Sequence, residues 1–296
     1  KKLSKSAGNT KDEPTALLET YGPDALRYWA ANGRPGMDVT LDHGQMKVGR
    51  RLAIKVLNAS KFALGVGLTD QPSPDAVTRP LDRAMLASLA DLTDEVTNAF
   101  DQFDYARAIE RTESFFWHFC DDYLELVKNR AYGNDDAAAS AQAALGAGLE
   151  ALLKLFAPTL PYVTEEVWSW WRTGSVHRAP WPKADDLRKV AGDQANPAVL
   201  AVAADVIGEL RKSKSEAKRS MRTEVATATV RDTEARLALL SEAEADVHAA
   251  GGVHALKTVV DQAGGADRKR RIRHVRQPAR LLRCDAQRFP VHHGAS

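Results

Sequence analysis

Residues 44–64 read GQMKVGRRLAIKVLNASKFAL, and their pattern sets the fold of most of the chain. Apolar residues recur three or four positions apart, as they do on the buried face of a helix. Four more helical stretches follow, separated by short breaks, and span residues 81–100, 103–132, 137–156 and about 159–168. We therefore predict a mainly α fold built on an antiparallel bundle of five amphipathic helices. Thr164 is predicted to be the N-cap of the fifth helix.

The opposite face of 44–64 carries one polar stripe at steps of 4, 4, 3 and 4 residues. Its three cations suit phosphate oxygens, and its amide and aromatic ring suit an exposed base, because proteins usually read RNA through unpaired bases. The alternative is a solvated basic face with the ring buried in the core. The stripe consists of Lys47, Arg51, Lys55, Asn58 and Phe62.

Residues 1–9 read KKLSKSAGN and combine lysines with small hydroxyl residues. Lysine ammoniums are compact charges with three donors each, and Ser and Gly let the backbone approach a ligand closely. We interpret this stretch as a phosphate-binding loop, with a solvated basic N-terminus as the alternative. Two short helices are expected next, one ending near Gly22 and one starting at Pro23.

Beyond the bundle, residues 196–220 predict a sixth long helix with a basic end, which suits either an RNA backbone or solvent. A strand at 224–230, a helix through Leu237 and Val247, and a possible strand at 256–260 indicate a small α/β appendage. Residues 267–296 hold nine Arg or Lys against two Asp, and we expect a disordered basic tail. The basic end of the helix consists of Arg211, Lys212, Lys214, Lys218, Arg219 and Arg222.

The composition is that of an ordinary globular protein, with 296 residues, a net charge of +2 and 44% hydrophobic residues. No apolar run approaches ~18 residues and no charged-then-apolar leader occurs, so we expect neither a transmembrane helix nor a signal peptide. Cys120 and Cys284 lie far apart and fit neither a disulfide framework nor a zinc site, which favours the cytoplasm. No metal site is expected within the chain.

Three motifs resemble class I aminoacyl-tRNA synthetases. Residues 2–6, KLSKS, are similar to the family's K-M-S-K-S signature, with Leu3 in the Met position. Residues 158–168 follow its P-x-x-P-x-x-T-E-E-x-W pattern, although Ala157 stands where the family usually has His. The F-C-D-x-Y-L-E-x-x-K run at 119–128 resembles the valyl enzymes more than the isoleucyl or leucyl enzymes. We identify the chain as a member of the valyl-tRNA synthetase family.

The resemblance implies an ATP-dependent activation of valine to valyl-adenylate and its transfer to valine tRNA. In that family the signature loop holds the ATP phosphates, so Lys2 and Lys5 are implied as catalytic residues. The implied ATP-binding residues are Lys2, Leu3, Ser4, Lys5 and Ser6. ATP with Mg²⁺ is the implied substrate, and the implied partners are valine tRNA, ATP and valine, with no membrane.

The run from Arg51 to Phe62 resembles the first helix of the anticodon-binding domain in the valyl, isoleucyl and leucyl enzymes. In these relatives that helix approaches the anticodon. The tRNA-binding residues expected from the resemblance and the stripe together are Arg51, Lys55, Asn58 and Lys61.

The expected organisation has four parts. Residues 1–33 form the signature loop and stem-contact helices, 34–183 the anticodon-binding bundle, 184–266 the α/β appendage and 267–296 the tail. We interpret the chain as the C-terminal part of a larger enzyme, expected to be inactive alone because the half with the H-I-G-H signature is missing. The alternatives are an isoleucyl or leucyl enzyme, a tRNA-binding module without catalysis, and a helical scaffold protein.

Overall fold

The computed structural model describes residues 13–68 and 74–261, together with the backbone of 272–276. Its first helices are α1 (Pro14–Tyr21) and α2 (Pro23–Ala31), and both begin at a proline, whose fixed φ suits the first helical position. Between them Gly22 has a φ of +86°, which turns the chain sharply. Both helices thus agree with the predicted pair.

The long helix α3 (His43–Gly65) follows, capped by the Asp42 carboxylate, which accepts hydrogen bonds from the N–H groups of Gly44 and Gln45. It crosses α2 very closely at Gly49, where a Cβ atom would lie 2.7 Å from the Cβ of Tyr28. Only glycine allows this approach without a shift of the backbone.

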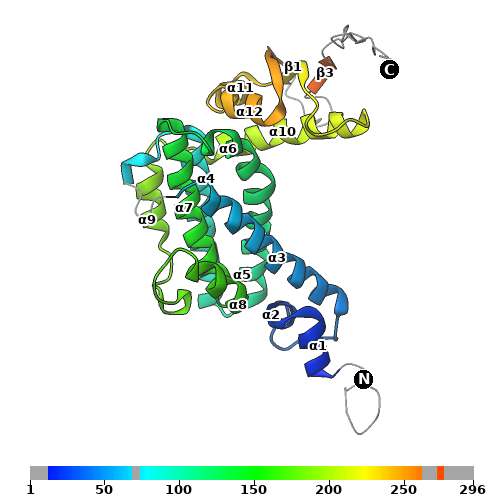
Figure 1. Cartoon of the computed structure of the whole chain (residues 1–296), viewed down its shortest axis with the longest axis vertical. Helices are drawn as coiled ribbons and strands as arrows, with labels where there is room; N and C mark the ends of the chain where they lie inside the picture. Colours follow the sequence, from blue (N-terminus) through cyan, green and yellow to red (C-terminus); the bar gives the residue numbers. More distant parts are fainter. Residues whose placement is uncertain (1–12, 69–73, 262–271, 277–296) are drawn as a thin grey trace, which may run out of the picture.

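The centre of the molecule is the predicted bundle of helices (Figure 1), which confirms the mainly α fold. A π-turn, η3, joins α5 to α6 in one continuous rod, and the short 3₁₀ turns η2 and η4 lie in the connections. The elements are η2 (Pro74–Ala76), α4 (Pro80–Asp101), α5 (Tyr105–His118), η3 (Phe119–Tyr123), α6 (Leu124–Ala131), α7 (Asp136–Phe156), α8 (Pro161–Ser169) and η4 (Val176–Arg178).

The core lies where α4 and α7 face each other and α5 closes over them. Leu86 and Leu89 of α4 and Leu145 of α7 are completely buried. Burial of one such leucine contributes about 1.5–3 kcal/mol. Phe116 of α5 packs edge-on against Phe156, with ring centroids 5.4 Å apart. This rigid core fixes the surfaces that the outer helices present.

The predicted cap of α8 at Thr164 is wrong. The helix begins at Pro161, and the Thr164 hydroxyl is buried within it and donates to the Leu160 carbonyl at 2.8 Å. The first turn is instead capped from α2, because the Asp24 carboxylate accepts from the N–H groups of Tyr162 (3.1 Å) and Val163 (2.8 Å). A local sequence pattern does not reveal a cap that comes from 138 residues away.

The appendage begins with α9 (Ala184–Ala191), which packs on α4, and α10 (Pro197–Glu216), which leads away from the bundle (Figure 1). A small sheet in the order β2-β1-β3 follows, with β1 parallel to β2 in the register Val225↔Val253. The remaining elements are β1 (Val225–Asp232), α11 (Glu234–Ser241), α12 (Glu244–Gly251), β2 (Val253–Val260) and β3 (Ile272–Arg276).

Strand β3 corrects one expectation, because it lies inside the range 267–296 that the sequence predicts as disordered. Its backbone pairs antiparallel with β1, with Val230 opposite Ile272. Ile272 and Val275 are its two β-branched residues and lie three positions apart among arginines, so no alternating pattern in the sequence indicates the strand. The rest of that range lies outside the described residues.

A cluster of charged side chains joins the appendage to the bundle. The Arg130 guanidinium donates to both oxygens of Asp82, at 2.8 Å each, and its Nε donates to Asp246 of α12 at 2.7 Å. Asp82 is fully buried and also accepts from the hydroxyls of Tyr123 (2.7 Å) and Ser140 (2.6 Å). Every lone pair that needs a donor therefore has one, which is the condition for burying a carboxylate.

Candidate nucleic-acid interface

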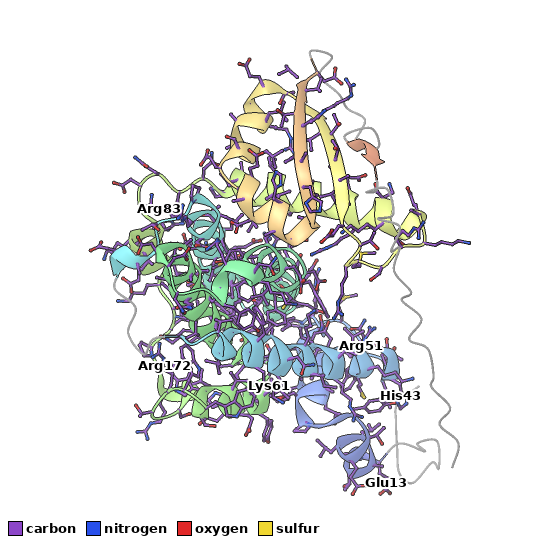
Figure 2. The ribbon with its side chains drawn as sticks, turned by 45° about the horizontal axis from the view of Figure 1, so that its top comes forward. Glu13, His43, Arg51, Lys61, Arg83 and Arg172 are labelled. Atoms are coloured by element: carbon purple, nitrogen blue, oxygen red, sulfur yellow. The ribbon has the colours of Figure 1, made fainter. Side chains whose placement is uncertain are left out.

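Helix α3 carries five cations and no carboxylate in its 23 residues. Its exposed face follows the helical period, and Ile54, 47% exposed, lies in the middle of it. Figure 2 labels Arg51 and Lys61, which both project from this helix. We call this face the α3 surface, and it consists of Lys47, Arg51, Ile54, Asn58 and Lys61.

This surface differs from the predicted stripe in two members. Lys55 and Phe62 are half-buried along one edge of α3, while Lys61 and Ile54 are exposed in their place. The reason is geometric: each four-residue step advances the direction of the side chain by about 40°, so repeated steps of four drift around the helix.

The exposed polar residues of the α3 surface are largely unengaged. Lys47 and Arg51 form no ion pair within the described part of the chain, and the side chain of Asn58 has no hydrogen-bond partner there. The neighbouring Arg50 is different, because its guanidinium donates to the Thr20 carbonyl and ties α3 to α1. The unengaged cations and amide are available to a ligand.

Lys55 is engaged. Its ammonium lies 2.9 Å from the Asp121 carboxylate and 5.3 Å from the centre of the Trp117 ring. Both partners come from the rod formed by α5, η3 and α6. Of the four predicted tRNA-binding residues, Lys55 alone has an acidic partner among the described residues.

Aromatic rings flank the α3 surface on both sides. On the side of α6, the ring of Phe62 meets the ring of Tyr132 edge-on at 5.9 Å, and the Lys128 ammonium lies 5.8 Å from the Phe62 ring. On the side of α8, the Lys61 ammonium lies 5.9 Å from the ring of Trp170. Tyr132 is 60% exposed and Trp170 38%, so both rings can stack on a planar ligand.

The sequence did not reveal that α3 is flanked by Lys128, Tyr132 and Trp170, because these residues lie 66 to 109 positions after Phe62 or Lys61 along the chain. Lys128 lies in α6, while Tyr132 and Trp170 directly follow α6 and α8, and all three reach α3 only through the packing of the bundle. The one signal in the sequence was the presence of large aromatic residues at helix ends, where a core position is less common.

The basic end of α10 is less open than its sequence suggests. The Lys214 side chain is buried, and its ammonium donates to the carbonyls of Gly251 (2.7 Å) and Met221 (3.0 Å), while burial lowers its pKa. Arg211 donates to the Asp121 carbonyl at 2.6 Å. The cations that are exposed are Lys212, Lys218, Arg219 and Arg222.

The described residues offer no constellation for bond-making chemistry. Cys120 is buried, and burial raises the pKa of its thiol to about 12, so the thiol stays protonated at neutral pH. Asp121 and Asp122 point to different partners and do not form a dyad, as the sequence indicates. Within the described ranges, no three His, Cys, Asp or Glu side chains gather as metal ligands would. No helix there has the length and apolar character to cross a membrane.

The loop with the predicted catalytic and ATP-binding residues lies outside the described residues. This applies to all five of its members: Lys2, Leu3, Ser4, Lys5 and Ser6.

The chain is similar in sequence to known tRNA ligases. Residues 82–230, from α4 to β1, match the family described as the anticodon-binding domain of tRNA ligase. The chain is 52% identical over 275 residues to a valine–tRNA ligase of Salinispora tropica, covering 87% of this chain and 32% of that protein. It is 55% identical over 258 residues to a valine–tRNA ligase of Thermobifida fusca, covering 86% of this chain and 29% of that protein.

The chain thus spans about a third of the length of these curated relatives. Among solved structures, a chain of a LeuRS–tRNA–LeuAMS ternary complex from Agrobacterium radiobacter matches with a TM-score of 0.48 and 22% identity. That match covers 63% of this chain and 22% of the other.

Proposed function

The chain belongs to the family that carries the anticodon-binding domain of tRNA ligases, and from that premise we propose that it forms the tRNA-binding part of a valine–tRNA ligase. The whole enzyme activates valine with ATP to valyl-adenylate and transfers the valyl group to valine tRNA. Residues 34–183 make the anticodon-binding bundle and residues 1–33 connect it to the catalytic part. The location is cytoplasmic, in keeping with the two separate cysteines.

The observation that carries this proposal is the α3 surface, which is a cationic helix face without a carboxylate and with aromatic rings on both sides. Lysine and arginine attract phosphates whatever the base sequence, so they supply affinity. An exposed amide and exposed rings read and stack unpaired bases, so they supply selectivity. The first role belongs to Lys47 and Lys61, and the second to Asn58 and Tyr132.

Arg51 combines both roles, because a guanidinium can pair with a base edge through two parallel donors. It is exposed in the N-terminal half of α3, one turn from Ile54 and two turns from Asn58. An anticodon base seated over Ile54 lies within reach of both polar side chains. We therefore assign Arg51 to base recognition.

The loop around Lys2 and Lys5 acts in the other half of the reaction. Its two ammoniums hold the phosphates of ATP, which enters with Mg²⁺, while the valine carboxylate attacks the α-phosphorus and displaces pyrophosphate. Leu3, Ser4 and Ser6 shape the loop.

In the whole enzyme, Lys5→Ala should slow valyl-adenylate formation, measured by pyrophosphate exchange, far more than it weakens tRNA binding. Equal losses in both would contradict this role.

The test of the proposed function is binding of the full chain to two labelled transcripts, valine tRNA and the same tRNA with an exchanged anticodon, over a series of salt concentrations. Wild-type protein should prefer the valine anticodon. Arg51→Ala should cost about 1–3 kcal/mol of binding free energy with valine tRNA and clearly less with the exchanged transcript.

Arg231→Ala is the matched control, because Arg231 is an exposed arginine on β1, outside the bundle and the α3 surface. It should leave the preference unchanged. Equal losses for both transcripts with Arg51→Ala would make Arg51 a backbone contact. Wild-type protein that binds both transcripts equally would overturn the assignment of the bundle as an anticodon reader.

A further inference from the structure

The π-turn η3 places one aspartate between two cationic helices. The Asp121 carboxylate lies 2.9 Å from the Lys55 ammonium of α3, and the Asp121 carbonyl accepts from Arg211 of α10 at 2.6 Å. Its neighbour Asp122 faces other groups, with one oxygen 3.0 Å from His118 Nδ1 and the other 3.8 Å from Arg211. The carboxylates of Asp121 and Asp122 therefore contact different groups.

The ion pair with Asp121 occupies the cation of Lys55, which lies at the edge of the α3 surface. The Lys55 side chain is still 34% exposed and that of Asp121 58% exposed, so a phosphate can reach the ammonium. A phosphate that does so must compete with a carboxylate already in contact. Lys47 and Arg51 on the same helix carry no such competitor among the described residues.

We propose that Asp121 is a specificity-determining residue of the RNA surface, whose carboxylate occupies Lys55 and so restrains sequence-independent binding. The inference rests on the proposed function. Each additional cation that contacts a phosphate raises the affinity for any RNA and steepens its salt dependence, without favouring one anticodon. A surface that discriminates between anticodons therefore becomes more selective when a cation that would contact only phosphates is neutralised.

The geometry also separates this role from a purely structural one. Arg211, which fixes α10 beside η3, is bound by the backbone carbonyl of Asp121 and not by its carboxylate. Replacement of the side chain thus frees Lys55 and leaves the anchor of α10 in place. An exposed ion pair of this kind contributes only about 0–1 kcal/mol to stability, so the variant should fold.

The experiment compares Asp121→Asn with Asp122→Asn in the full chain. Both variants lose one negative charge on the same turn, but only Asp121 pairs with Lys55. Binding is measured with the valine transcript and the exchanged-anticodon transcript at several salt concentrations. Asp121→Asn should tighten binding of the exchanged transcript roughly two- to fivefold and steepen its log–log salt slope by about one, with a smaller gain for the valine transcript.

The double variant Lys55→Ala/Asp121→Asn should lose this gain. Equal effects of Asp121→Asn and Asp122→Asn would show that the release of Lys55 is not the cause and would overturn the inference. A gain that persists without Lys55 would overturn it as well. If the wild-type chain instead showed no preference for the valine anticodon, the proposed function would be overturned, and the inference with it.

Discussion

Lys214 shows that a charged residue in a basic stretch of sequence need not be accessible to a ligand. It lies among six cations at the end of α10, and in sequence it has the same weight as its neighbours. In the structure its side chain is 5% exposed, and its ammonium bridges the carbonyls of Met221 and Gly251, where the chain returns into the sheet. Its charge therefore stabilises a turn and does not reach a ligand.

Lys214→Met should reduce the free energy of unfolding by about 1–3 kcal/mol, because two carbonyls at the buried site lose their charged donor. The salt slope of RNA binding should stay the same. Urea unfolding and salt-dependent binding measure the two quantities. Lys212→Met is the control, since this exposed neighbour should leave stability within about 0.5 kcal/mol. A shallower salt slope for Lys214→Met would place its ammonium at the RNA after all.

At the scale of elements, α2 is the part that connects the N-terminal helices to the bundle. Asp24 caps α8, Arg27 donates to the Pro158 carbonyl at 2.8 Å, and the Tyr28 hydroxyl donates to Glu113 of α5 at 2.6 Å. Burial raises the pKa of Asp24, although the N–H groups of Tyr162 and Val163 act in the opposite direction. Burial of the Asp24 carboxylate therefore costs desolvation free energy, and its two hydrogen bonds with backbone N–H groups offset part of that cost.

Asp24→Ala should lower the free energy of unfolding by about 1–2 kcal/mol, because it leaves two backbone N–H groups at the start of α8 without an acceptor. Asp24→Asn keeps one acceptor oxygen and should cost less. Hydrogen exchange should accelerate at the amides of Tyr162 and Val163.

Asp135→Ala is the comparison for Asp24→Ala, since Asp135 caps its own helix α7 through the N–H of Ala138. Its effect on exchange should stay in α7, whereas Asp24→Ala should also loosen α2. If Asp24→Ala left the exchange of α8 unchanged, Asp24 would not be the cap.

At the scale of the whole molecule, the cluster around Arg130 couples the bundle to the appendage. One guanidinium holds the buried Asp82 of α4 and Asp246 of α12 at once. The side chain of Arg130 is only 15% exposed and that of Asp82 is fully buried, so screening by solvent is weak. The cluster thus ties α12 of the appendage to α4 and α6 of the bundle.

Arg130→Ala should destabilise the protein by about 3–5 kcal/mol, because it leaves the buried Asp82 carboxylate without a cation. Asp246→Asn should cost less, since the pair of Arg130 and Asp82 stays intact. The two variants are compared by chemical unfolding and by hydrogen exchange of α12. Exchange in α12 should rise with Asp246→Asn while α4 stays protected. A small and equal loss in both variants would contradict the coupling.

The sequence alone determined the helices and the class of the fold. Spacing of apolar residues, prolines at helix starts and glycines at breaks act within a few residues, so α3, α4, α7 and α10 are confirmed close to their predicted bounds. The motifs at 119–128 and 158–168 also identified the family. The assignments of Lys2 and Lys5 to ATP, and of Arg51 and Asn58 to tRNA, stay predictions.

Which charged groups are free depends on how the helices pack together. Their packing paired Lys55 with Asp121, buried Lys214, moved the cap of α8 from Thr164 to Asp24, and brought Tyr132 and Trp170 beside α3. Each of these contacts joins residues of different helices or of a distant turn, and its energy depends on distance and burial, which helical periodicity does not contain. The local pattern therefore specifies the elements, and the packing of those elements decides which cations meet solvent.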